Sequence, residues 1–244
     1  MRNRENWQPT KYVLRAERWE PSRNPRELAP VSRLSASFAL SATQRAIAKH
    51  ARGHLADLGC GKVPFFGLYR SMVDEVTCID WPQSPHETDH IDLAADLNLP
   101  LPLPDASFDT ILSSSVLEHI WDHKVFWDET SRLLRPGGKA IIIVPFIYGL
   151  HEEPHDYFRW TCHAFARACE ERGLVVRELE PYGGGPDVLA DLLVRSIGIV
   201  SMRLAGWIAS GFARLLGGGL SRRLAPQAFD RLPLGYLLVA ERLA

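Results

Sequence analysis

Glycine and acidic residues in the first third of the chain form a pattern that suits ligand binding. The run Asp57-Leu58-Gly59-Cys60-Gly61 follows a short apolar segment, and its glycines let the main chain approach a ligand closely. Asp80 follows the next apolar segment, where a carboxylate can accept hydrogen bonds from both hydroxyls of a ribose. Pro64 interrupts the G-x-G-x-x-G fingerprint of dinucleotide enzymes. The pattern indicates a site for a ribose-containing ligand, but glycines at such a turn can also serve packing alone.

A second polar segment spans residues 151–161 and combines histidine, acidic, arginine and aromatic residues. His155 or His151 could take a proton from an acceptor hydroxyl, because imidazole is a common general base near neutral pH. Arg159 could clamp an anionic group of an acceptor, or Asp156 could hold Arg159 as a structural brace. The residues alone leave these alternatives open.

The elements that must position these residues alternate between strands and helices. Helical patterns cover 32–52, 64–72, a stretch that ends before 136–138, and a segment that Thr161 can cap and Gly173 can end. The segments with strand patterns are 54–58, 75–80, 90–92, 108–113, 140–144, 174–179 and 235–241. This alternation predicts an α/β fold with a doubly wound, mostly parallel sheet. Ligands of such sheets bind outside the carboxyl ends of the strands, where the polar residues fall.

From about Leu55 to Leu179 the chain resembles the class I S-adenosylmethionine (SAM)-dependent methyltransferases, in the ubiquinone-biosynthesis-like branch known as methyltransferase type 11. The resemblance rests on ordered motifs, which are the glycine turn, Asp80, Asp96-Leu97, and the runs 99–109, 113–120 and 133–139. It implies a Rossmann-like, seven-stranded sheet in which the last strand inserts antiparallel beside the fifth.

The resemblance implies SAM as cofactor and assigns a role to each matching residue. Asp57, Gly59 and Gly61 would hold the methionine end, Asp80 the ribose, and Trp81 would lie against the adenine. The other expected contacts are Asp96 with the adenine amino group, Leu97 beside it, Ser113 under the sulfonium, and Cys60 in the glycine turn.

The acceptor is less defined than the cofactor. Residues 151–161 resemble the E-P-x-D-y-f-R-f-T signature of a smaller bacterial group of methyltransferases, many of which accompany cell-surface polysaccharide genes. We expect a small or lipid-linked glycan acceptor, methylated at a hydroxyl oxygen. Amino methylation of adenine or glutamine would show an Asn/Asp-Pro-Pro-Tyr/Phe stretch after the fourth strand, where this chain has Ser113-Ser114-Ser115-Val116. The alternative function is a non-catalytic SAM-binding or membrane-tethered scaffold.

Several histidines and a glutamate raise the question of a metal site. Glu118, His119 and His123, together with His151 and His155, are residue types that bind metal. The spacing lacks the second glutamate of one metal-dependent group of RNA-end methyltransferases, and Leu-Glu-His is common in metal-free members of the family. The sequence therefore predicts no metal.

We expect one methyltransferase domain over residues 1–244. Its parts would be an N-terminal arm and helix (1–52), a SAM-binding core (53–182), a helical insertion (183–225) and the final strand (226–244), with the arm acting as a lid. The apolar, arginine-containing segment 188–219 suits either a homodimer interface or lid, or peripheral insertion into a membrane surface. On the membrane hypothesis its arginines stay in water, while seven residues enter the lipid: Leu193, Ile197, Val200, Leu204, Trp207, Ile208 and Phe212.

Composition bounds the remaining possibilities. The chain has 244 residues, 46% of them hydrophobic and 23% charged, which is typical of a globular domain and unlike a disordered chain. The net charge of −1 argues against nucleic-acid binding, which usually requires a broad basic surface. Four cysteines without Cys-x-x-Cys spacing, and an N-terminus without an apolar signal sequence, predict a cytoplasmic protein that is at most peripheral at the inner face of the membrane.

Overall fold

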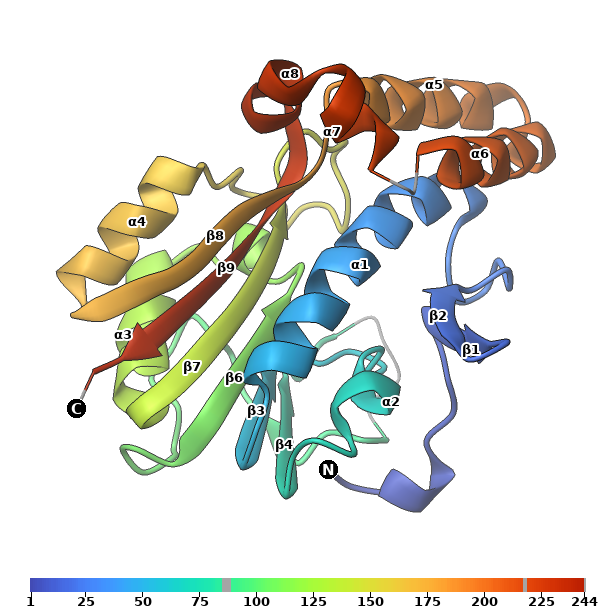
Figure 1. Cartoon of the computed structure of the whole chain (residues 1–244). Coiled ribbons are helices and arrows are strands. Elements are labelled where there is room, and N and C mark those ends of the chain that lie inside the picture. Colours follow the sequence, from blue (N-terminus) through green and yellow to red (C-terminus); the bar gives the residue numbers. More distant parts are fainter. Residues whose placement is uncertain (85–88, 217–218, 244) are drawn as a thin grey trace.

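A seven-stranded sheet forms the centre of the molecule (Figure 1) in the computed structural model, which describes residues 1–84, 89–216 and 219–243. The strand order is β5-β4-β3-β6-β7-β9-β8. The strands are β3 (His54–Leu58), β4 (Glu75–Asp80), β5 (Leu93–Ala94), β6 (Phe108–Ser114), β7 (Leu134–Pro145), β8 (Leu174–Gly184) and β9 (Pro233–Arg242). Strands β3 to β7 pair in parallel, and β9 lies antiparallel between β7 and β8. The predicted fold class is confirmed, including the antiparallel last strand.

Helices cover both faces of the sheet and divide its core into two layers. One face packs against α1 (Arg33–His50) and α2 (Phe66–Tyr69), and the other against α3 (His123–Leu133) and α4 (Cys162–Glu171). In β7, Ile141 and Ile143 face the first layer, whereas Ile142 faces the second. Burial on both faces explains why this strand is apolar at successive positions.

Local signals set most element ends, with several differences from expectation. Thr161 caps α4 by accepting a hydrogen bond from the Ala164 amide at 3.1 Å, as predicted. The helix expected over 64–72 is confined to α2, and the third strand is β5 at 93–94 rather than 90–92. Strand β7 already begins at Leu134 because the Pro-Gly-Gly run extends the strand instead of only separating it from α3.

The N-terminal arm contains a small hairpin that the sequence pattern did not predict. The elements of the arm are η1 (Arg4–Asn6), β1 (Tyr12–Arg15), β2 (Arg18–Pro21) and η2 (Pro30–Ser32), and β1 and β2 form the hairpin. The Trp7 indole donates a hydrogen bond to the Val63 carbonyl at 3.1 Å. Trp19 fills the space beside Gly67, where an added Cβ would lie 2.2 Å from the ring. The arm is therefore fastened next to the turn that follows β3.

The insertion is helical and begins at the carboxyl edge of the sheet, because β8 runs parallel to β7. It contains α5 (Pro186–Val200), α6 (Met202–Leu216), α7 (Leu220–Leu224) and α8 (Pro226–Arg231). The hairpin of α5 and α6 packs on the start of α1 through small and branched side chains, among them Leu34, Val194, Ala205 and Ala209. The segment 226–244, expected to be only the final strand, begins with α8, and its strand starts at Pro233. Residues 217 and 218 of the predicted 188–219 segment lie outside the described residues.

One arginine of the insertion departs from expectation. Arg195 forms an ion pair with Asp191 at 2.6 Å, and its guanidinium lies 3.9 Å from the centre of the Tyr148 ring. The prediction that the arginines stay in water is therefore wrong for Arg195. Its side chain is 21% exposed, so the carboxylate and aromatic partners replace most of its hydration.

No helix within the described residues combines the length and the hydropathy needed to cross a membrane.

Candidate active site

A cavity of about 1110 Å³ opens at the carboxyl edge of the sheet. It is lined by the N-terminal arm, by α1, by the glycine turn after β3, by the segments after β4 to β7, and by residues of β8 and β9. The volume exceeds the roughly 300–1,000 Å³ of a typical single-ligand pocket. The cavity therefore has room for a cofactor together with an acceptor.

The glycine turn presents main chain to this cavity. Gly59 and Gly61 have φ angles of 69° and 50°, a region that favours glycine. Gly59, Cys60 and Gly61 all line the cavity, as predicted for a backbone-lined site. A Cβ on Gly59 would also lie 2.4 Å from the Val116 side chain. Both explanations for glycine thus apply at this position, ligand approach and packing.

Two carboxylates support the turn in different ways. Asp80 lines the cavity and accepts hydrogen bonds from the amides of Gly61 at 2.5 Å and Trp81 at 2.7 Å. Asp57 is buried behind the turn, does not line the cavity, and accepts a hydrogen bond from the Tyr69 hydroxyl at 2.9 Å. Burial, and to a smaller extent the nearby Asp80 charge, raise the pKa of Asp57 to about 7 against the lowering effect of the Tyr69 hydrogen bond.

The other predicted cofactor residues are only partly brought together. Trp81, Asp96 and Leu97 line the cavity, and Asp96 is fixed by hydrogen bonds from Asn98 at 2.7 and 2.9 Å. Ser113 is buried and lies outside the lining, which includes Ser114 instead. Ser114 is the last residue of β6 and reaches the carboxyl edge of the sheet, whereas Ser113 lies one residue inside the strand.

The segment after β7 places its two predicted histidines at the cavity. His155 Nδ1 lies 2.8 Å from the Tyr157 hydroxyl, and its ring packs edge-on against Trp81 with centroids 5.2 Å apart. His151 also lines the cavity. Burial lowers the pKa of His151, but the neighbouring carboxylates of Glu118 and Asp156 outweigh this effect and raise it overall.

Asp156 and Arg159 form a brace rather than part of the cavity wall. Arg159 donates to both oxygens of Asp156, at 2.6 and 2.8 Å, and to the Phe158 carbonyl at 2.8 Å. Its hydrogen bonds hold the pKa of Asp156 at about 2, and neither residue lines the cavity. This geometry favours the brace, one of the two alternatives that the sequence left open, and a catalytic role for either residue stays a prediction.

Three of the five residues weighed as metal ligands come together. Ligand atoms of Glu118, His119 and His151 all lie within 4.8 Å of one another. His123 instead packs against the rings of Phe158 and Trp160. The sequence-based prediction of no metal rested on spacing, which does not reveal this grouping because its members belong to two loops.

The cavity also contains residues that sequence reasoning missed. Thr10 and Lys11 reach it from the N-terminal arm, and Tyr148 and Tyr182 from the segments around β7 and β8. Tyr12, followed by other nearby groups that include Glu118, raises the pKa of Lys11 against the effect of burial. No local motif marks these residues, since their positions depend on contacts between distant segments.

Comparison with known proteins agrees with this geometry. The family model described as Methyltransferase domain (Methyltransf_11) matches residues 56–142. A probable SAM-dependent methyltransferase of Mycolicibacterium smegmatis is 49% identical over 45 residues, which are 18% of this chain and 18% of that protein. Demethylmenaquinone methyltransferase of Anoxybacillus flavithermus is 27% identical over 135 residues, 52% of this chain and 56% of that enzyme. The matches thus span less than two thirds of the length of these relatives.

The fold has a wider match than the sequence. The structure of a SAM-dependent methyltransferase from Mesorhizobium loti superimposes with a TM-score of 0.53 at 18% identity, covering 84% of this chain and 98% of that one. The family model and the curated relatives show that this part of the chain is similar to SAM-dependent methyltransferases, and the superposition shows that the chain has the seven-stranded fold of such an enzyme.

Proposed function

We propose that the protein transfers a methyl group from SAM to a hydroxyl oxygen of a small or lipid-linked acceptor. The observation that carries the proposal is the cavity of about 1110 Å³, which joins the glycine turn and Asp80 on one side to the histidine-containing loop after β7 on the other. Both halves of a transfer reaction would therefore meet in one space.

The residues present fit SAM on three counts. The turn at Gly59 and Gly61 offers main chain instead of a phosphate-binding cradle, as a cofactor without phosphate requires. Asp80 can accept ribose hydroxyls, and Trp81, Asp96 and Leu97 form a wall suited to adenine. Asp57 places a second carboxylate behind the turn, which favours a positively charged ligand.

The protein's own task in the reaction is to orient the acceptor and receive its proton. When bound, SAM supplies a methyl group on an already activated sulfonium, so positioning can account for much of the rate. His155 is the proposed base. In the tautomer with its proton on Nδ1, that N–H donates to the Tyr157 oxygen, and Nε2 can take the hydroxyl proton.

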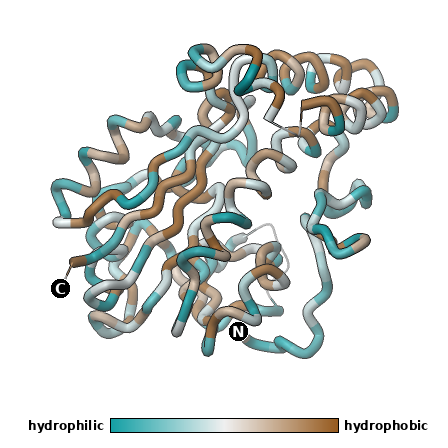
Figure 2. The backbone as a smooth tube through the Cα atoms, in the orientation of Figure 1, coloured by the Kyte–Doolittle hydropathy of each residue, from teal (hydrophilic) through white to brown (hydrophobic). Residues whose placement is uncertain are grey.

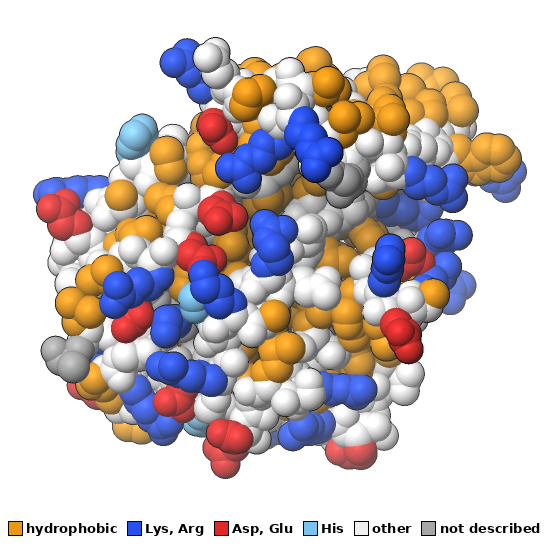
Figure 3. Space-filling model, viewed as in Figure 1, with side chains coloured by type: hydrophobic (Ala, Val, Ile, Leu, Met, Phe, Trp, Pro, Cys, Tyr) orange, Lys and Arg blue, Asp and Glu red, His pale blue; other side chains and the backbone are white. Residues whose placement is uncertain are grey.

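The outer surface of the insertion supports a lipid-linked acceptor and a peripheral membrane contact. Apolar side chains on α5 and α6 stay exposed, including Leu189 at 71%, Ile199 at 89%, Val200 at 89% and Trp207 at 82% (Figure 3). The tube view shows many hydrophobic (brown) positions along both helices, with pale and hydrophilic (teal) positions between them (Figure 2). Helix α6 carries two exposed arginines and no acidic residue, so its charge complements anionic headgroups. The alternative is that this face binds a second copy of the chain.

The rival function is a non-catalytic SAM-binding or tethering scaffold. A turnover measurement distinguishes it from a methyltransferase. We expect purified protein to transfer label from methyl-tritiated SAM into the lipid fraction of a bacterial cell-envelope extract, and Asp80→Asn to lose this transfer. Binding of S-adenosylhomocysteine without transfer into envelope lipids or glycans would favour the scaffold instead.

A further inference from the structure

Glu118 is a fully buried carboxylate that does not itself line the cavity but lies next to His119, which does. Its side chain is 0% exposed, and it follows β6 within η3 (Leu117–His119). Among the described residues, neither of its carboxylate oxygens has a hydrogen-bond partner, and Nε2 of His119 has none. Buried carboxylates are normally satisfied by hydrogen bonds, by a cationic partner or by a metal ion. This group therefore requires an explanation.

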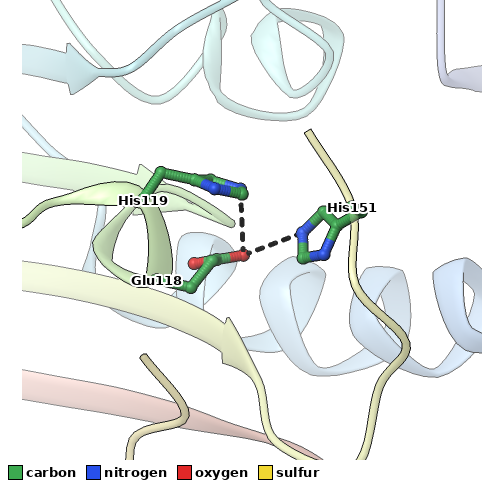
Figure 4. Close-up of side chains that lie close together, drawn as sticks. All are labelled: Glu118, His119 and His151. Carbon is green, nitrogen blue, oxygen red and sulfur yellow. Dashed lines mark ion pairs between the residues drawn. The ribbon is translucent and has the colours of Figure 1, made fainter. Parts of the chain in front are cut away.

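Main-chain contacts hold the surrounding residues in place. The Glu118 carbonyl accepts hydrogen bonds from the amides of Tyr157 at 2.9 Å and Phe158 at 3.2 Å, which joins η3 to the loop after β7. The same loop brings His151 to the carboxylate. Figure 4 shows one oxygen of Glu118 facing both the His119 and the His151 ring. The cluster thus comes from two fastened segments rather than from chance contact of surface side chains.

Hydrogen bonds to Nδ1 fix the tautomers of the His119 and His151 rings. His119 Nδ1 lies 2.8 Å from the His155 carbonyl, and a carbonyl only accepts, so Nδ1 carries the proton. His151 Nδ1 lies 3.3 Å from the Gly149 carbonyl and 3.3 Å from the Asp156 carboxylate, which are also acceptors. In their neutral forms both rings therefore direct an Nε2 lone pair toward Glu118. Such outer partners are typical of metal-binding histidines.

The distances favour a metal ion over a shared proton. Glu118 Oε1 lies 3.8 Å from His119 Nε2 and 3.6 Å from His151 Nε2. An N–H···O hydrogen bond spans about 2.7–3.2 Å, so a proton does not close these gaps. Two ligands bound tetrahedrally at about 2.1 Å from a zinc ion lie about 3.4 Å apart, which small side-chain shifts would achieve here.

We propose that Glu118, His119 and His151 bind a divalent first-row metal ion of the Zn²⁺ type. Three protein ligands with nitrogen and oxygen donors leave a coordination position open, as in catalytic rather than structural metal sites. His119 and His151 line the cavity, so the open position faces the acceptor. Building on the proposed function, an acceptor hydroxyl would bind at that position, where a metal ion would lower the pKa of the hydroxyl, and His155 would take its proton. Metal binding itself does not depend on the identity of the acceptor.

The test is metal binding to the whole protein after dialysis against a chelator. We expect calorimetric titration with Zn²⁺ to show one site per chain. Glu118→Gln, His119→Ala and His151→Ala should each weaken it on the order of 100-fold. His163→Ala is the matched control, because His163 is an exposed histidine on α4, and it should leave the affinity unchanged. Co²⁺ serves as a spectroscopic probe and should give d–d bands without thiolate charge transfer.

Three results would overturn the metal site: no stoichiometric Zn²⁺ binding, equal affinity in wild type and Glu118→Gln, or a thiolate band with Co²⁺, which would assign the ion to a cysteine. S-adenosylhomocysteine affinity is measured on the same chelated samples. If it binds while Zn²⁺ does not, the metal site fails and the proposed cofactor site stands. If Zn²⁺ binds while S-adenosylhomocysteine does not, the proposed methyl transfer fails and the metal site stands.

Discussion

The hydroxyl of Tyr69 donates a 2.9 Å hydrogen bond to the carboxylate of Asp57, in the core directly behind the glycine turn. Burial raises the pKa of Asp57 to about 7 despite this bond. A buried acid behind a turn that faces a cationic ligand couples ligand binding to proton release, because the ligand favours the ionised carboxylate.

The first prediction concerns pH. Below pH 7 the carboxyl of Asp57 is largely protonated in the free protein, so SAM binding must release a proton and is weakened. Affinity should rise from pH 6 to pH 8 and then level off. Calorimetry in two buffers with different ionisation enthalpies measures the released proton. The dependence of SAM affinity on pH should vanish in Asp57→Asn. An unchanged dependence in that variant would assign the released proton to another group.

The second prediction concerns Asp80. Replacing it by Ala removes acceptors for the cofactor hydroxyls and for the Gly61 and Trp81 amides. SAM binding should weaken by about 1.5–3 kcal/mol, the range for hydrogen bonds to a charged group. Asp74→Asn, at an exposed position, is the control. Wild-type affinity in Asp80→Ala would contradict the assignment. Gly59 is a poorer test, because any side chain there collides with Val116.

The fold could be predicted where local sequence and burial agree. Strand β7 is apolar at successive positions because helices cover both of its faces, so the pattern alone indicated a central strand. The hairpin of β1 and β2 has no such pattern. Packing of Trp7 and Trp19 on the α2 region holds the arm, and these contacts join distant parts of the chain.

The residues of the candidate site also fall into two groups, those that sequence motifs predict and those that only contacts between distant segments bring together. Gly61, Asp80 and Asp96 follow strand ends closely in sequence, so the motif order placed them at the cavity. Glu118 and His151 meet only because amides of the loop after β7 bind the Glu118 carbonyl. A motif cannot encode a contact that depends on the path of a loop. For the same reason the sequence left the roles of Asp156 and Arg159 open.

The third prediction concerns His155. His155→Ala should lower turnover on the order of 10²-fold or more, since it removes the proposed base. S-adenosylhomocysteine affinity should stay nearly unchanged, and His163→Ala should match wild type in both measurements. An unchanged rate would exclude His155 as the base. A loss of cofactor affinity with no further loss of turnover at saturation would instead assign the ring to packing against Trp81.

The fourth prediction concerns the brace. Arg159→Ala leaves the carboxylate of Asp156, whose side chain is 1% exposed, without its bidentate partner. Because Arg159 is itself partly exposed, the loss should fall near the lower end for a buried pair, about 3 kcal/mol, or roughly 6–12 °C in Tm. Arg167→Ala breaks only exposed ion pairs on α4 and should change Tm little. Equal Tm values for wild type and Arg159→Ala in thermal unfolding would contradict the brace.

The fifth prediction concerns the exposed face of α5 and α6. Ile199 and Trp207 are 89% and 82% exposed, and burying such a side chain contributes about 1.5–3 kcal/mol. The protein should therefore co-sediment with vesicles that contain anionic phospholipid, less so at high salt, because Arg203 and Arg214 on α6 attract the headgroups. The double variant Ile199→Ser/Trp207→Ser should bind at least tenfold more weakly.

The control for this variant is Leu14→Ser, which removes an exposed leucine from the β1–β2 hairpin, and it should leave vesicle binding unchanged. Light scattering after gel filtration shows whether a second copy of the chain covers this face instead of lipid. If the intact protein stays in the supernatant at low salt and is a dimer that the double variant converts to a monomer, the face joins two copies of the chain. The membrane contact then fails, and the proposal of a lipid-linked acceptor loses the support of the insertion, because the apolar surface would be covered by protein rather than lipid.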